Sequence, residues 1–293
     1  MPTFTAADGT ELAYHLRGEG APLVVLPGGP MQASAYLGDL GGLAAHRRLV
    51  LLDLRGTGDS ATPADPGSYR CDRLVADVEA LRAHLGLDRM DVLAHSAGAG
   101  LAMLYAARYP ERVARLVLVT AIPWALGMPA TTEQRLAAAR LRSGEPWFPE
   151  AFPALERWLA GRSDYDPACA PFLYGRWDDT ARRHEARAEE QFNDEASEIY
   201  GSDGAYDPPA TRAALARVTA PVLVLAGELD GGPRPELARA AADAFPDSDF
   251  TVQPGAGHYP WLDDPDWFAG RVTRFLEGRG VPAPPAARPE ATP

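Results

Sequence analysis

The sequence contains no lysine, so all 28 of its basic residues other than histidine are arginines. They are outnumbered by 40 aspartates and glutamates, which leaves a net charge of −12 at neutral pH. A protein that binds nucleic acid needs a strongly basic surface to contact the phosphates. The charge balance therefore argues against a nucleic-acid partner.

Cysteine is scarce, and no long apolar run is present. The two cysteines, Cys71 and Cys169, are far apart and form no C-x-x-C motif, so we expect free thiols in a reducing compartment. The most apolar stretch, residues 116–130, is short and interrupted by Pro123 and Pro129, which argues against a membrane span. The amino-terminal residues do not resemble a signal peptide. We therefore expect a cytoplasmic protein without a membrane partner.

Short apolar runs recur along the chain, and helical patterns follow most of them. Such runs, without polar alternation, are typical of strands covered on both faces in a parallel sheet. The Asp8-Gly9 turn before residues 12–16 predicts an antiparallel hairpin at the sheet edge. The alternation predicts an α/β fold with a doubly wound, mostly parallel sheet. The expected strands are 23–26, 49–52, 90–94, 116–120, 222–226 and 250–252, and the expected helices are 72–85, 97–109 and 235–245.

The strand–helix rhythm stops between residues 124 and 217, where prolines interrupt helical pieces and aromatic residues are dense. We interpret this segment as a helical cap inserted between two strands of the sheet. The predicted core then comprises residues 1–123 and 218–278. Residues 279–293 are rich in proline and alanine without periodicity, which predicts a disordered tail.

A nucleophile motif follows the expected strand at residues 90–94. Ser96 lies between that strand and the next helix, with Ala94 and Gly98 two residues to either side. A sharp turn that lifts a serine hydroxyl above a sheet crowds both flanking positions, so small residues are required there. The pattern is A-x-S-x-G rather than the usual G-x-S-x-G. The alternative is that Ser96 only caps the helix.

A serine nucleophile needs a general base and an orienting acid. In α/β folds with this strand–serine–helix turn, the three residues follow in the chain order Ser, Asp or Glu, His. Asp230 follows the strand at 222–226, and His258 ends a glycine-rich loop after the strand at 250–252. Both loops leave the carboxyl ends of strands, where open α/β sheets carry their sites. Glu228 is the reserve acid. His95 adjoins Ser96 on the turn and should point away from it, so we expect a packing or pocket-rim residue.

An acyl-transfer site also needs N–H groups directed at the developing oxyanion. The N–H of Ala97, directly after the nucleophile, is one candidate. The loop after the first buried strand supplies the second, for which Gly29 is preferred and Gly28 is next. Pro30 has no N–H and is excluded.

Together these motifs resemble the α/β-hydrolase superfamily over residues 4–278. The segment 53–60 is similar to the D-x-R-G-x-G-x-S loop of capped members. Residues 28–30 are similar to the H-G-G-P-G loop of proline iminopeptidases, although Pro27 replaces its histidine and Gln32 stands in a region that family fills with glycine.

The resemblance implies that carboxylates of the cap anchor a free substrate amine. Glu195 or Glu198, before Tyr200, could provide this contact, and Trp177 stands in a segment similar to the family's Trp-Glu motif. The aromatic residues of the cap predict a mostly apolar pocket. The expected substrate contacts are Gly28, His95, Trp124, Trp177, Glu198 and Tyr200.

The sequence thus predicts a serine hydrolase that cleaves a small ester or amide through an acyl-enzyme on Ser96. Cleavage of an amino-terminal residue is the preferred reaction if the enzyme is a peptidase. The same triad could instead act on a thioester, a lactone or a carbon–carbon bond. A third hypothesis is a non-catalytic binding protein on the same scaffold. The mechanism needs no metal or organic cofactor, the substrate is a small molecule, and the oligomeric state is left open.

Overall fold

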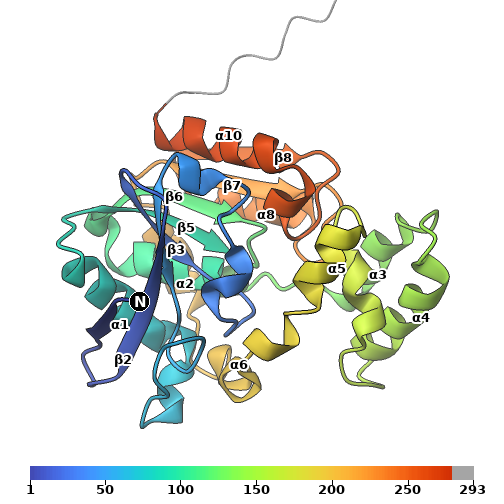
Figure 1. Ribbon diagram of the computed structural model, residues 1–293, viewed down its shortest axis with the longest axis horizontal. Coiled ribbons are helices and arrows are strands. Elements are labelled where there is room, and N and C mark those ends of the chain that lie inside the picture. Colours follow the sequence, from blue (N-terminus) through green and yellow to red (C-terminus); the bar gives the residue numbers. More distant parts are fainter. Residues whose placement is uncertain (279–293) are drawn as a thin grey trace, which may run out of the picture.

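A computed structural model describes residues 1–278, and the predicted tail at 279–293 lies outside the described residues. Its centre is an eight-stranded sheet in the order β1-β2-β4-β3-β5-β6-β7-β8 (Figure 1). The pairs β1–β2 and β2–β4 are antiparallel, and all later pairs in this order, from β4–β3 to β7–β8, are parallel. The strands are β1 (Thr3–Thr5), β2 (Glu11–Arg17), β3 (Pro22–Leu26), β4 (Arg48–Leu52), β5 (Met90–His95), β6 (Val113–Val119), β7 (Val222–Gly227) and β8 (Ser248–Gln253).

The predicted fold class is confirmed by this sheet and by the helices on its two faces. On one face lie α1 (Cys71–His84), α2 (Gly98–Arg108) and α8 (Pro235–Ala242), and α10 (Pro265–Leu276) covers the other. Because both faces are covered, the central strands are buried along most of their length, which explains their continuous apolar sequences. None of the helices within residues 1–278 is long and apolar enough to cross a bilayer.

The expected hairpin at the amino end is also confirmed. The strands β1 and β2 pair in antiparallel register, with Thr5 opposite Glu11. The turn between them places Gly9 at a φ of 89°, and the Asp8 carboxylate accepts a hydrogen bond from Thr10 N at 3.0 Å. A left-handed residue and an aspartate that bonds its own backbone are what this turn requires.

The parallel register determines where the site can form. Leu26 of β3 lies opposite Ala94 of β5, and Ala226 of β7 lies opposite Val252 of β8. The chain therefore leaves these strands at the same edge of the sheet. Side chains that are more than 200 positions apart in the sequence can meet at this edge.

A helical segment separates β6 from β7. Its outer part, formed by α3, α4 and the 3-10 helix Pro167–Leu173, encloses an apolar cluster of its own and lies beside the sheet (Figure 1). At the carboxyl-terminal end of the segment, α7 packs against α2 of the core. The helices are α3 (Thr132–Arg140), α4 (Phe148–Leu159), α5 (Asp179–Glu185), α6 (Asp194–Tyr200) and α7 (Pro208–Leu215). The boundaries predicted for the cap, residues 124 and 217, stay a prediction.

A buried ion pair fastens the loop after β4 to the core. Arg55, which is 4% exposed, donates to Asp77 Oδ2 of α1 at 2.8 Å and to Asp8 Oδ2 of the hairpin turn at 2.6 Å. The hydrogen bond from Arg55 lowers the pKa of the Asp8 carboxyl to about 2. This arginine therefore joins three segments through two carboxylates.

Replacing Asp77 with alanine should remove a large part of the stability. The guanidinium of Arg55 would stay buried with Asp8 as its remaining partner, and breaking a buried pair costs up to about 3–5 kcal/mol in the free energy of unfolding. Urea unfolding measures this loss. The matched control is Asp72→Ala on the same helix, because Asp72 pairs with the solvent-accessible Arg70 and its loss should change stability far less. Equal losses in the two variants would contradict the assignment of Arg55 as a buried anchor.

Candidate active site

Ser96 occupies a tight turn between β5 and α2. Its φ of 55° lies in the left-handed region, which a serine rarely adopts and which marks a site of backbone strain. A Cβ atom at Gly98 would lie 2.3 Å from the carbonyl oxygen of Pro27, so glycine is required there. Ala94, on the other flank, is fully buried, and its methyl group fits. The small residues on both sides of Ser96 are thus explained by close packing around the turn.

The structure brings the three predicted triad side chains together. His258 Nε2 lies 2.8 Å from Ser96 Oγ, and His258 Nδ1 lies 2.8 Å from Asp230 Oδ2. Asp230 is fully buried, and its other oxygen accepts from Gly232 N at 2.8 Å. Because the carboxylate can only accept, the Nδ1 atom of His258 carries the proton and Nε2 is free to accept one from Ser96. Glu228, the reserve acid, is exposed and accepts from the backbone N–H of Gly255 instead.

The loop after β3 approaches this turn closely. A Cβ atom at Gly28 would lie 2.7 Å from the Cβ of Ser96. The N–H of Gly28 donates to Tyr36 Oη at 2.7 Å and is therefore engaged. Within residues 1–278, the N–H groups of Gly29 and Ala97 make no hydrogen bond. Of the two candidate glycines, Gly29 is thus the one with a free donor.

His95 is buried beside the triad base. It is 2% exposed, its Nδ1 lies 2.7 Å from Tyr36 Oη, and its Nε2 lies 2.9 Å from the carbonyl oxygen of His258. Both ring nitrogens are therefore engaged within the protein. Of the two roles expected from the sequence, the structure gives it that of a packing residue, with no nitrogen available to a substrate.

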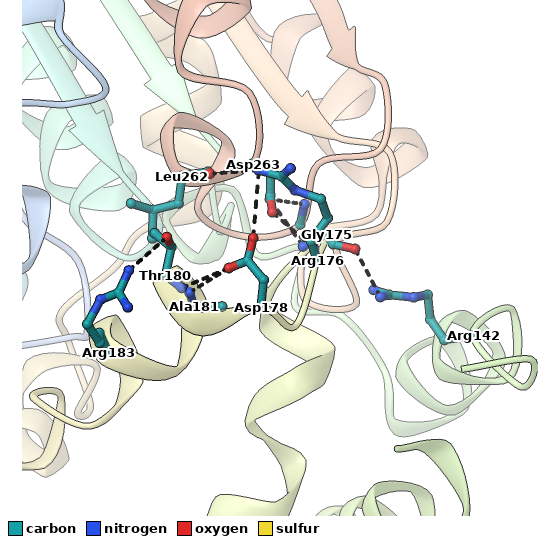
Figure 2. Close-up of polar contacts among 10 residues, drawn as sticks. Arg142, Gly175, Arg176, Asp178, Thr180, Ala181, Arg183, Leu262 and Asp263 are labelled. Atoms are coloured by element: carbon teal, nitrogen blue, oxygen red, sulfur yellow. Dashed lines mark hydrogen bonds and ion pairs between the residues drawn. The ribbon is translucent and has the colours of Figure 1, made fainter. Parts of the chain in front are cut away.

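A carboxylate absent from the predicted site holds the loop that carries His258. Asp263, at the end of α9 (Pro260–Asp263), accepts from Gly257 N at 2.8 Å and from the N–H groups of Gly175 and Arg176 at 3.1 Å. Figure 2 shows Asp263 facing Gly175 and Arg176. The N–H of His258 itself donates to Leu173 O at 2.7 Å. The segment between α4 and α5 is therefore bonded directly to the His258 loop.

Arg142 also bonds to the segment between α4 and α5. Its guanidinium is 5% exposed and donates to the carbonyl oxygens of Tyr174 at 2.9 Å and Gly175 at 3.1 Å, as Figure 2 shows for Gly175. Asp263 follows His258 in the chain, so the triad order Ser, Asp or Glu, His gives it no role. The signal that could have indicated it was an aspartate just beyond a glycine-rich loop, whose N–H groups need acceptors.

Two charged side chains of the helical segment were also missed. Glu185 of α5 accepts from Tyr174 Oη at 3.0 Å, and burial raises the pKa of its carboxyl. Arg135 of α3 lies over the ring of Trp158 at 5.2 Å and, within residues 1–278, has no carboxylate partner. Burial lowers the pKa of Arg135, and the negative charge of Asp230 opposes this shift. Arg135 is therefore within electrostatic reach of the triad acid.

The remaining predicted substrate contacts have different surroundings, and their role stays a prediction. Trp177 packs on Tyr174 and lines a cavity of about 640 Å³ whose walls belong to the helical segment alone. Trp124 is half-buried against the core. Tyr200 is buried and donates to the carbonyl oxygen of Ala97 at 2.9 Å, whereas Glu198 is exposed on α6. Glu198 and Tyr200 are two residues apart on α6, so they point to different sides of the helix.

Comparison with known proteins agrees with this architecture. The family model described as the alpha/beta hydrolase fold matches residues 21–265. The chain belongs to this family. A proline iminopeptidase of Levilactobacillus brevis is 27% identical to this α/β-hydrolase, over 89% of this chain and 90% of the relative.

Two solved structures extend the comparison. The proline iminopeptidase of Mycobacterium smegmatis superimposes with a TM-score of 0.72 at 26% identity, covering 95% of this chain and 98% of its own. An esterase from a Rhodococcus species gives a TM-score of 0.73 at 25% identity, covering 95% and 99%. The resemblance to proline iminopeptidases is therefore confirmed, and an esterase is equally similar in structure.

The buried His95 should make the stability of this α/β-hydrolase sensitive to acid. Burial lowers the pKa of His95 well below its ordinary value, and the nearby charge of His258 lowers it further. Below about pH 6.5 the unfolded chain binds a proton at this residue that the folded chain does not. Stability should therefore fall as the pH drops, by up to about 1.4 kcal/mol per pH unit from this group.

Urea unfolding of the wild type and of His95→Gln between pH 7 and pH 5 tests this sign. The variant should lose stability less steeply with acid, because residue 95 no longer binds a proton when it unfolds. His46→Gln is the matched control, since His46 is exposed and should leave the slope unchanged. Parallel curves for wild type and His95→Gln would contradict the expectation.

Proposed function

We propose that this α/β-hydrolase is a serine hydrolase that cleaves a small ester or amide through an acyl-enzyme on Ser96. The observation that carries the proposal is the continuous hydrogen-bonded path from Ser96 Oγ through His258 to Asp230, with both links at 2.8 Å. This is the arrangement that converts a weakly nucleophilic hydroxyl into an attacking group.

The reaction proceeds in two steps. In the first, Ser96 Oγ attacks the carbonyl carbon while His258 Nε2 takes its proton, and Asp230 stabilises the imidazolium. The free N–H groups of Gly29 and Ala97 stabilise the oxyanion, and the imidazolium then protonates the leaving group. In the second step His258 activates a water molecule, which releases the acid and restores Ser96.

An aminopeptidase is the first candidate for the substrate class. The similarity to proline iminopeptidases supports it, and such an enzyme needs a carboxylate to bind the free amine of its substrate. Glu185 is better placed for this contact than Glu198, because Tyr174, which donates to it, packs on Tyr259, the neighbour of His258, at 5.0 Å between ring centroids. A bound ammonium would also favour the ionised form of a carboxyl whose pKa is raised by burial.

An esterase is the second candidate, and Arg135 favours it. A guanidinium without a carboxylate partner in the described part of the chain, near the triad acid, would repel a substrate ammonium and attract a neutral or anionic group. The similarity to the Rhodococcus esterase supports the same choice. A fluorophosphonate probe and a pair of substrates separate the hypotheses.

Labelling by a fluorophosphonate should depend on residue 96. The wild type should be labelled and should hydrolyse 4-nitrophenyl acetate, whereas Ser96→Ala should lose labelling and about 10⁴-fold or more in kcat/KM. Ser202→Ala, a change at an exposed serine, serves as the control and should keep both activities. Equal labelling of Ser96→Ala and wild type would support a binding protein and refute the hydrolase proposal.

The role of Glu185 should appear only with substrates that carry a free amine. Proline 4-nitroanilide should be cleaved and its N-acetyl derivative should not, and Glu185→Gln should raise KM for the first about tenfold because an ion pair becomes a neutral contact. The same variant should leave KM for 4-nitrophenyl acetate unchanged. Glu198→Gln is the matched control. Activity on acetylated and free substrates alike would rule out the aminopeptidase and leave the esterase.

A further inference from the structure

Tyr36 and His95 form a hydrogen-bonded pair behind the triad that neither the motif nor the mechanism uses. Tyr36 Oη lies 2.7 Å from His95 Nδ1 and accepts from Gly28 N at 2.7 Å. His95 Nε2 lies 2.9 Å from the carbonyl oxygen of His258. The pair therefore spans the distance between the loop that carries Gly29 and the loop that carries the base. Both side chains are at most 5% exposed.

The partners fix every proton in this path. The carbonyl oxygen of His258 can only accept, so His95 Nε2 carries the hydrogen and donates it. His95 Nδ1 is then the bare nitrogen, and it accepts the single hydroxyl hydrogen of Tyr36. The Tyr36 oxygen is left to accept from the Gly28 N–H. Reversing the imidazole tautomer would set a bare nitrogen against a carbonyl oxygen, so one arrangement is allowed.

The backbone of His258 is held from the same side by a second donor. Thr120 Oγ1, just after β6, donates to the His258 carbonyl oxygen at 3.0 Å, so both lone pairs of this oxygen are engaged. The ring of His95 also lies 4.9 Å from the ring of His258, centroid to centroid. A shift of His95 would therefore move the backbone of the base.

We propose that Tyr36 and His95 are positioning residues that set the oxyanion loop and the base relative to one another. The path runs from Gly28 N–H through the tyrosine hydroxyl and the imidazole to the His258 carbonyl, and each of its polar groups is bonded within the protein. This inference rests on the proposed hydrolase function. Its consequence is that a single hydroxyl group outside the triad affects the rate of the chemical step.

A positioning role differs measurably from a purely structural one. If the pair holds geometry needed only in the transition state, kcat and kcat/KM should fall together while KM stays unchanged. If it only packs the interior, its loss should lower stability and leave the kinetic constants of the folded enzyme alone. Both quantities therefore have to be measured on the same variants.

Tyr36→Phe is the decisive variant, because it removes one oxygen and keeps the ring. We expect kcat and kcat/KM for 4-nitrophenyl acetate to fall about tenfold, the effect of leaving a buried donor and acceptor unpaired. The rate of fluorophosphonate labelling should fall in parallel. Tyr105→Phe is the matched control. Tyr105 of α2 is fully buried, and its hydroxyl donates to Glu79 of α1 at 2.8 Å. It should lower the melting temperature without changing kcat.

Two changes at His95 complete the series. His95→Leu removes both contacts and should lower kcat at least as much as Tyr36→Phe, whereas His95→Gln restores an amide donor and should recover part of the rate. A His95→Leu variant that fails to fold leaves the decision with Tyr36→Phe.

Each outcome has one meaning. Wild-type kcat in Tyr36→Phe, accompanied by a loss of melting temperature like that of Tyr105→Phe, overturns the positioning role and leaves the hydrolase proposal intact. A wild type that is not labelled at Ser96 overturns the hydrolase proposal and this inference with it. Lowered kcat with unchanged KM, confined to residues 36 and 95, supports the inference.

Discussion

The candidate site depends on the fixed position of one imidazole, that of His258. Its ring bonds to Ser96 and Asp230, its N–H bonds to Leu173, and its carbonyl oxygen accepts from His95 and Thr120. These partners come from separate parts of the chain. Holding a group by its backbone as well as its ring restricts rotation and translation together, which is how a protein prepares a site before a substrate arrives.

The strained turn at Ser96 is the second part of the site that is held in a fixed position. A serine in the left-handed region costs free energy, and the surrounding packing must compensate for it. The carbonyl oxygen of Pro27, in the loop after β3, packs closely on Gly98. The hydroxyl of Tyr200, on α6, donates to the carbonyl oxygen of Ala97. The close packing of Pro27 on Gly98 thus keeps the turn in place and also holds the loop of Gly29 next to it.

The sequence allowed the sheet and the proposed triad to be predicted because their signals are local. Apolar runs such as 222–226 indicate buried strands, and the chain order of Ser96, Asp230 and His258 is a property of the fold. The groups that escaped prediction act across the fold. Nothing near Tyr36 in the sequence shows that it bonds to another loop, and nothing near Asp263 shows that it also reaches Gly175 and Arg176. Choosing between Glu185 and Glu198 requires the orientations of α5 and α6, which periodicity alone does not provide.

The direct bonds between the His258 loop and residues 173–176 limit how the helical segment can change. The outer helices, α3, α4 and their neighbours, pack on an apolar cluster of their own and are the part that can change most freely. A graft that exchanged the whole segment would also remove Leu173 and Gly175, the partners that hold His258 and Asp263. Evolution or engineering can therefore replace the outer helices while residues 173–176 are retained.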